Sequence, residues 1–180
     1  MSHLKTLCIA LAAPGGQRSA RVRHAVTSEL QPPLLPGVLF WFGDMWAALR
    51  QGGVLAVEDP DFDAFCCHAP NEGFDFLPRT SSQVLQRRGG DHTIGPKPYS
   101  YFLTAGIPRP EIAVVQSLWT EGEEKTLACS TLEASADAIV SESIASEDEV
   151  AQALSTLQRF TANPQTLICG PRVFQLWSRQ

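Results

Sequence analysis

The clearest pattern in the chain is an unbroken apolar run at residues 54–57, which follows two glycines and ends in Glu58 and Asp59. Such a run is typical of a strand buried on both faces, which favours a parallel strand in an α/β sheet. Gly52 and Gly53 fit a left-handed helix end that passes directly into a strand. Since open α/β sheets bind ligands at the carboxyl ends of their strands, the pattern predicts a site near Glu58 and Asp59.

Upstream of this run the pattern is less regular. Residues 4–13 suit either a strand or a short helix, and residues 21–30 predict a short helix that ends before a pair of prolines. Residues 38–42 form a second apolar run and predict a strand, followed by a helix that starts at Met45. The connection to residues 54–58 is close to the minimum length for a crossover, so we expect these two strands to be neighbours.

Downstream, the spacing of apolar positions predicts helices that alternate with strands. The strongest helix start is Ser146-Glu147-Asp148-Glu149, a capping box in which Ser146 and Glu149 each accept a backbone hydrogen bond. The predicted elements are a long loop at 59–78, helices at 80–88, 99–105, 127–144 and 146–163, and strands at 112–118 and 173–178.

Composition places the chain among ordinary globular proteins. Its 180 residues suggest one domain, and its net charge of −5 disfavours a nucleic-acid partner, which would need clustered Lys and Arg. Five cysteines without repeat spacing indicate reduced thiols in a cytoplasmic protein rather than a disulfide framework. The apolar stretch at residues 7–13 is too short to span a bilayer, so we expect no membrane insertion.

Several short segments from residue 49 onwards follow one another in a particular order. They are Leu49-Arg50-Gln51-Gly52-Gly53, then residues 54–59, Pro70-Asn71-Glu72-Gly73-Phe74, Gly89-Gly90-Asp91, Ile94-Gly95, Ala105-Gly106-Ile107, Glu121-Gly122-Glu123 and Pro171-Arg172-Val173-Phe174-Gln175-Leu176-Trp177. In this order they resemble the C-terminal portion of a class I S-adenosylmethionine-dependent methyltransferase. The resemblance covers residues 45–179.

This resemblance implies a fold, an activity and a partner. The fold would be α/β, an incomplete Rossmann-like methyltransferase sheet of mixed direction, with an antiparallel last strand and flanking helices. Residues 45–180 would be the C-terminal half of that domain, and residues 1–44 an atypical leader that replaces missing strands. The activity would be transfer of a methyl group from S-adenosylmethionine to a small-molecule acceptor.

Residues 1–44 depart from the family. A methyltransferase has an early strand followed by a Gly-x-Gly loop against the cofactor, whereas Ala13-Pro14-Gly15-Gly16 lacks that spacing. We therefore assign no cofactor-binding residue and expect impaired activity. The alternative is a non-catalytic, truncated methyltransferase-like protein that acts as a binding or dimerisation module. Loss of the early strands would expose an edge at residues 54–58, and exposed edges recruit other strands, so this alternative predicts a homodimer.

The candidate site residues follow from the strand end and from the family. Asp59 and His92 are the candidate catalytic groups, because a carboxylate or an imidazole can accept a proton from the acceptor. The competing interpretation of His92 is a helix stop followed by an aspartate turn, and that of the acidic cluster is a solvated loop. The candidate substrate-binding residues are Glu58, Asp59, Asp61, Phe62 and Asp91, with Asp63 in the same acidic cluster.

Two further groups of residues have alternative interpretations. Phe62, Phe65, Phe74 and Phe76 form either an apolar lid or part of the core. Cys66-Cys67-His68 invites a zinc interpretation, but adjacent cysteines alternate sides of an extended chain, and no second cysteine pair lies at zinc-finger spacing. The Asp-x-Asp spacing would leave a hard cation short of ligands. The sequence therefore predicts no metal site.

Overall fold

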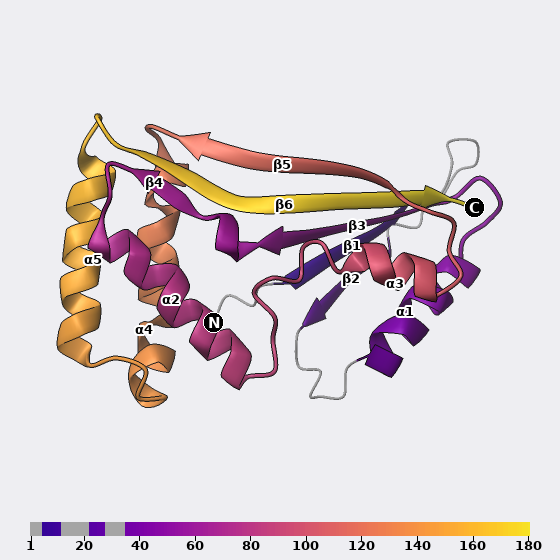
Figure 1. The fold of residues 1–180 in the computed structure, drawn as a ribbon, viewed down its shortest axis with the longest axis horizontal. Coiled ribbons are helices and arrows are strands. Elements are labelled where there is room, and N and C mark those ends of the chain that lie inside the picture. The colour runs from indigo at the N-terminus through magenta and orange to yellow at the C-terminus, as the bar shows by residue number, and fades with distance from the viewer. Residues whose placement is uncertain (1–4, 12–21, 28–34) are drawn as a thin grey trace. The chain divides into compact units, whose positions relative to one another are not determined.

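The computed structural model describes residues 5–11, 22–27 and 35–180, and its fold is α/β, with antiparallel strand pairs and flanking helices (Figure 1). The chain forms two compact units whose sequences interleave. The helical unit comprises residues 62–92 and 116–172, and the sheet unit comprises the described residues among 3–61, 93–115 and 173–180. The boundary falls within strands β5 (Glu111–Trp119) and β6 (Leu167–Arg179).

The sheet unit is built on hydrogen-bonded strands. The strand order is β2-β1-β3-β6, and β5 pairs with β6. Here β1 spans Lys5–Leu11, β2 spans Val22–Thr27 and β3 spans Val54–Asp61. Of the strand and the helix considered for residues 4–13, the structure has the strand, at residues 5–11. The helix predicted at residues 21–30 is wrong, because β2 occupies residues 22–27.

Strand β3 lies between two antiparallel neighbours. Leu7 of β1 pairs with Glu58, and Leu11 pairs with Val54. At the other side, Gln180 accepts a hydrogen bond from Gly52 N at 2.8 Å and donates to Gly53 O at 2.9 Å, so the end of β6 meets the start of β3. The last strand is thus antiparallel to β3, as predicted. The parallel direction predicted for residues 54–57 is wrong with respect to both neighbours.

The same pairing corrects the predicted sheet edge. Residues 54–58 are covered by β1 on one side and β6 on the other, so they do not form an exposed edge. Buried positions at Leu55, Val57 and Asp59 alternate with half-buried ones along β3. The alternation is hidden in the sequence because Val54 and Ala56 are apolar although they are only half-buried.

The strand predicted at residues 38–42 is also wrong, because helix α1 spans Leu35–Ala47. Phe42 is buried, and Met45, Trp46 and Leu49 pack against the same cluster at helical spacing. The ring of Phe42 meets that of Phe102, from helix α3 (Pro98–Thr104), edge-on at 5.3 Å. The core of the sheet unit consists of Phe42, Leu55, Val57, Phe102, Ile107 and Leu176.

The helical unit contains three long helices. They are α2 (Glu72–Arg87), α4 (Leu127–Ser141) and α5 (Glu147–Ala162), accompanied by strand β4 (Cys66–His68) and the 3-10 turns η1 (Phe62–Ala64) and η2 (Glu123–Thr126). The three helices contact one another and enclose a second core, in which Leu132, Ile139 and Leu157 have no exposed surface. None of the helices in the described part of the chain is long and apolar enough to cross a bilayer.

Local signals explain where these helices begin. The capping box of α5 is confirmed: Ser146 Oγ accepts from Glu149 N, and the Glu149 carboxylate accepts from Ser146 N at 2.8 Å. Helix α2 begins eight residues before the predicted start at Thr80, because Asn71 caps it by accepting from Phe74 N at 2.9 Å. The loop predicted at 59–78 is therefore wrong over its last third, where Pro78 lies inside the helix. It is also wrong where β3 continues to Asp61 and where β4 forms.

Candidate functional site

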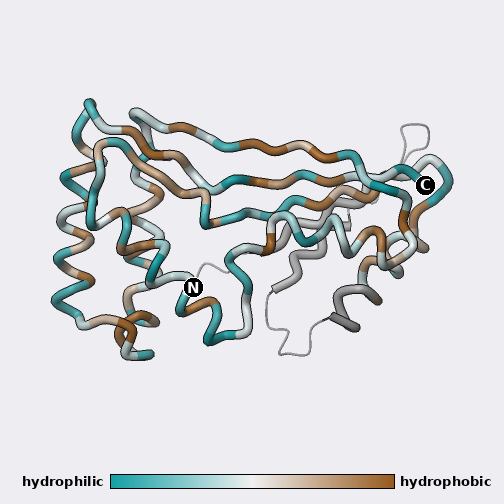
Figure 2. Tube along the Cα trace, viewed as in Figure 1, coloured by the Kyte–Doolittle hydropathy of each residue, from teal (hydrophilic) through white to brown (hydrophobic). Residues whose placement is uncertain are grey.

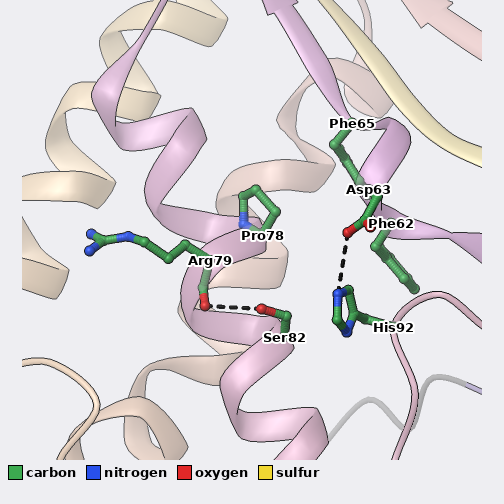
Figure 3. A pocket seen from close by; sticks show the side chains of 7 residues that line it. All are labelled: Phe62, Asp63, Phe65, Pro78, Arg79, Ser82 and His92. Carbon is green, nitrogen blue, oxygen red and sulfur yellow. Dashed lines mark hydrogen bonds and ion pairs between the residues drawn. The ribbon is translucent and has the colours of Figure 1, made fainter.

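A cavity of about 270 Å³ lies within the helical unit (Figure 3). Three segments form it: η1 with the residue that follows it, the middle of α2, and the turn after α2. The lining residues are Phe62, Asp63, Phe65, Pro78, Arg79, Ser82 and His92. This cavity brings two of the candidate residues, Phe62 and His92, together with Asp63.

The position of His92 depends on how α2 ends. Gly89 adopts φ +75°, the left-handed conformation that favours glycine, and Gly90 N donates to Leu85 O at 2.8 Å. The predicted helix stop is therefore confirmed. The chain then returns to η1, where Phe62 N donates to His92 O at 3.0 Å. The helix stop and the presence of His92 in the cavity are thus compatible, because the same turn produces both.

The His92 side chain makes polar contacts through both ring nitrogens. Nε2 lies 3.2 Å from Asp63 Oδ1, and Nδ1 lies 3.5 Å from Gln86 Nε2. A neutral ring that carries its hydrogen on Nε2 satisfies both contacts, donating to the carboxylate and accepting from the amide. The Asp63 side chain is 66% exposed and that of His92 22% exposed, so the pair is accessible to a ligand from solvent.

The apolar side of the cavity is aromatic. The rings of Phe62 and Phe65 stack at 5.5 Å with an interplanar angle of 9°, and Phe65 meets Phe74 at 6.0 Å. Phe74 and Phe76 are buried in the core. The four phenylalanines therefore divide between the two interpretations: Phe62 and Phe65 line the cavity, whereas Phe74 and Phe76 are core residues.

Helix α2 contributes a hydroxyl and a carbonyl but no cation. The Arg79 guanidinium lies 5.4 Å from the Phe76 ring centroid and points away from the cavity (Figure 3). Ser82 Oγ donates to Arg79 O at 3.1 Å. These side chains do not form a hydrolytic triad of Ser82, His92 and Asp63. The Ser82 hydroxyl is hydrogen-bonded to the backbone, and the two His92 nitrogens face Asp63 and Gln86 rather than Ser82.

The remaining predicted residues lie elsewhere. Glu58, in the sheet unit, accepts from Gln175 Nε2 at 2.6 Å, and Asp59 is buried. The backbone of Asp61 approaches Gly95 so closely that a Cβ there would lie 3.2 Å from Asp61 N. Asp91 precedes His92 but is not a lining residue of the cavity. The substrate-binding roles of these four acidic residues stay predictions.

The contributions of Pro78 and Ser82 to the cavity were missed by the sequence reasoning. Both residues fall within or beside a stretch that was predicted as loop. The available signal was Asn71, an N-cap residue, followed by Pro78 and Ser82 four positions apart, which places them on one face of a helix.

The cavity of the helical unit differs from an S-adenosylmethionine site. It is slightly smaller than the roughly 300–1,000 Å³ typical of ligand pockets, and no glycine lines it. In addition, Leu11 at the carboxyl end of β1 pairs with Val54 at the start of β3. The carboxyl end of β1 therefore lies at the opposite end of this strand pair from Asp59. The glycine cluster at residues 13–16 falls outside the described residues.

No protein family model and no curated protein sequence matches this chain. Among the residues that the structure describes, no group of three or more His, Cys, Asp and Glu side chains is arranged to hold a metal ion. The chemistry of the cavity is therefore the basis of the functional argument.

Proposed function

We propose that this chain is a methyltransferase-like protein of impaired activity that binds a small organic molecule in the cavity of the helical unit. The observation that carries the proposal is the Asp63–His92 pair beside the stacked rings of Phe62 and Phe65. An apolar surface with a few convergent polar groups is the usual composition of a small-molecule site. The family resemblance supports a methyl acceptor as the ligand.

The lining residues define the chemistry of that ligand. A flat, apolar ring would pack against Phe62 and Phe65. The polar group should donate hydrogen bonds, because the accessible groups are the Asp63 carboxylate and a hydroxyl, while the Arg79 guanidinium is directed away. A small aromatic amine meets both requirements, whereas an anionic group would face the Asp63 carboxylate and meets only the first, and only if it is carried on such a ring. Hydroxyl and amine groups are also the nucleophiles that methyl acceptors carry.

Calorimetric titration of the full chain tests the ligand proposal. The probe is tyramine, a planar ring with an ammonium group. We expect His92→Ala and Asp63→Asn to weaken tyramine binding about tenfold or more, since a hydrogen bond to a charged group contributes about 1.5–3 kcal/mol. Arg79→Ala is the matched control, because its guanidinium points away from the cavity, and it should bind tyramine as the wild type does.

Two results would contradict the proposal. One is the absence of tyramine binding, or equal binding by all variants. The other is a dissociation constant for S-adenosylmethionine in the low micromolar range, about −8 kcal/mol, which would restore a complete methyltransferase. We expect no measurable heat with S-adenosylmethionine.

A second candidate function, dimerisation, is favoured by strand β5. Within the sheet unit its residues Ile112, Val114 and Val115 are 48%, 49% and 48% exposed, and among the described strands β5 pairs only with β6. Figure 2 shows this hydrophobic segment along β5. We propose that a second copy of the chain pairs with this edge. In antiparallel self-pairing the two Glu111 carboxylates lie at opposite ends, so like charges do not meet.

Sedimentation velocity tests the dimer directly. We expect a concentration-dependent dimer for the wild type and a monomer for Ile112→Lys, because a lysine on an edge strand opposes strand addition. The matched control is Leu127→Lys, which places a lysine at an exposed apolar position outside β5 and should leave the dimer intact. A wild-type monomer at every soluble concentration would refute the pairing.

A further inference from the structure

Two thiols face each other across a strand pair in the helical unit. Strand β4 pairs with β6 in antiparallel register, and Cys66 lies directly opposite Cys169. The two thiols interact, since Cys66 helps to raise the pKa of Cys169. Cys66 is exposed and Cys169 is half-buried. Neither residue lines the cavity described above.

The backbone at this pair is suited to a disulfide. Residues directly opposite in an antiparallel pair have Cα atoms about 4.5–5.5 Å apart, which lies inside the 4.4–6.8 Å range of disulfides. Their Cβ atoms are about 4.5–5.5 Å apart, against about 3.5–4.5 Å in a disulfide, so only a small approach is required. Strand β4 has three residues and one partner strand, which permits that approach.

The neighbouring thiols are placed differently. Cys67 pairs with Ile168, alternates to the other face of the strand and packs against the core, where its Sγ lies 3.4 Å from Ala69 O. Cys129 is buried beside Thr161, with 3.7 Å between Sγ and Oγ1. Among the thiols from Cys66 onwards, Cys66 and Cys169 are therefore the pair in direct opposition.

We propose that Cys66 and Cys169 form a reversible disulfide on reaction with a small-molecule disulfide such as oxidised glutathione. The Cys66 thiol releases its proton, and its thiolate attacks one glutathione sulfur, which displaces a glutathione thiolate and leaves a mixed disulfide. The Cys169 thiol then releases its proton and attacks Cys66 Sγ, which displaces the second thiolate. The two cysteines lose two electrons and two protons, and oxidised glutathione becomes two glutathione thiols.

The environment of the two thiols sets the order of attack. Burial and the adjacent thiols of Cys66 and Cys67 raise the pKa of Cys169 to about 11, so few Cys169 thiolates exist at neutral pH. Cys66 is exposed and can meet the oxidant first. Once the mixed disulfide has formed, Cys169 is held against it, and the second step gains the advantage of an intramolecular reaction.

The disulfide would also affect the cavity. Phe65 precedes Cys66 directly and stacks on Phe62 in the cavity wall. A bond between β4 and β6 would restrict this segment. This consequence rests on the proposed ligand site, whereas formation of the disulfide does not.

Peptide mass spectrometry after oxidation tests the disulfide. The folded full-length chain is treated with oxidised glutathione, alkylated with iodoacetamide and digested without reduction. The variant Cys67→Ser is used beside the wild type, because it leaves a single cysteine in the peptide that contains Cys66. We expect a peptide in which Cys66 is linked to Cys169, lost on treatment with dithiothreitol.

Two variants separate the steps. In Cys169→Ser the reaction should stop at glutathione bound to Cys66, and in Cys66→Ser we expect Cys169 to remain free and alkylated. The proposal is overturned if the wild type retains glutathione on Cys66 while Cys169 is alkylated, or if Cys169 links to any other cysteine. Circular dichroism of Cys67→Ser checks that its fold is retained, and fragment spectra of the wild-type peptide give the assignment independently of that variant.

Discussion

The helical unit and the sheet unit each bury an apolar core, yet they differ in where chemistry is accessible. In the sheet unit, the acidic residues at the end of β3 are engaged within the sheet: Glu58 accepts from Gln175, and Asp59 is buried. In the helical unit, a cavity is lined by Asp63, which lies in the segment after β3, and by the turn after α2. The segment that lines the cavity therefore begins directly after the predicted strand end, whereas Glu58 and Asp59 belong to the sheet unit.

The reason for this difference lies in strand direction. The strand-end rule holds where parallel strands bring several carboxyl ends to one edge and leave a crevice at a switch point. Strand β3 has antiparallel neighbours, so the carboxyl ends of β1 and β6 lie at the other edge. The short turn η1 and helix α2 form the concave surface instead.

The largest expected effect comes from emptying either core. Phe102 in the sheet unit and Leu157 in the helical unit have no exposed surface. We expect Phe102→Ala to lower the free energy of unfolding by about 3–5 kcal/mol and Leu157→Ala by about 2–5 kcal/mol. Because the two clusters have separate members, hydrogen exchange should increase first in β3 and α3 for Phe102→Ala and in α2 and α5 for Leu157→Ala. Equal increases in both units would show one cooperative core.

A smaller effect should follow from removing a buried cation in the helical unit. Lys125 is 2% exposed, and its Nζ donates to Thr120 O at 3.0 Å and to Asn163 O, at the end of α5, at 2.7 Å. We expect Lys125→Met to cost about 2–4 kcal/mol in urea unfolding, because two carbonyls lose their donor. The exposed Lys97→Met is the control and should change stability little. A loss as small as that of the control would mean that water replaces the ammonium group.

Two glycines contrast the close packing of the helical unit with open space in the sheet unit. A Cβ at Gly73 would lie 2.5 Å from Ala153 O, whereas one at Gly43 in α1 would meet nothing within 4 Å. We expect Gly73→Ala to destabilise the protein by about 1–3 kcal/mol because it pushes α2 from α5. Gly43→Ala should stabilise by about 0.5–1 kcal/mol, since alanine favours helix. Thermal unfolding measures both, and equal signs would contradict the contrast.

The smallest effect concerns the cap of α5 and depends on pH. Hydrogen bonds from the Ser146 backbone N–H and hydroxyl lower the pKa of Glu149 below its ordinary 4.5. The ionised group therefore stabilises the fold above pH 4.5, and this contribution is lost as pH falls through the lowered pKa. We expect the melting temperature of Glu149→Gln to lie below that of the wild type at neutral pH and to converge with it in acid. A constant difference would show that ionisation has no part in the cap.

Local patterns predicted several elements correctly, for one physical reason. The capping box at Ser146, the helix stop at Gly89, the helix over 127–144 and the strands at 112–118 and 173–178 depend on residues close in sequence. The apolar runs at 38–42 and 54–57 gave a wrong element and a wrong strand direction. In a short run without alternation, helix and strand leave the same signal.

The sequence by itself determined that the capping box at Ser146 starts a helix and that residues 54–59 form an interior strand, because backbone hydrogen bonding and local apolar spacing decide these features. Tertiary structure alone decided that β1 runs against β3, that Asp63 meets His92, and that Cys66 faces Cys169. These contacts join residues far apart in the chain, and their geometry follows from how whole elements pack, which no local pattern encodes.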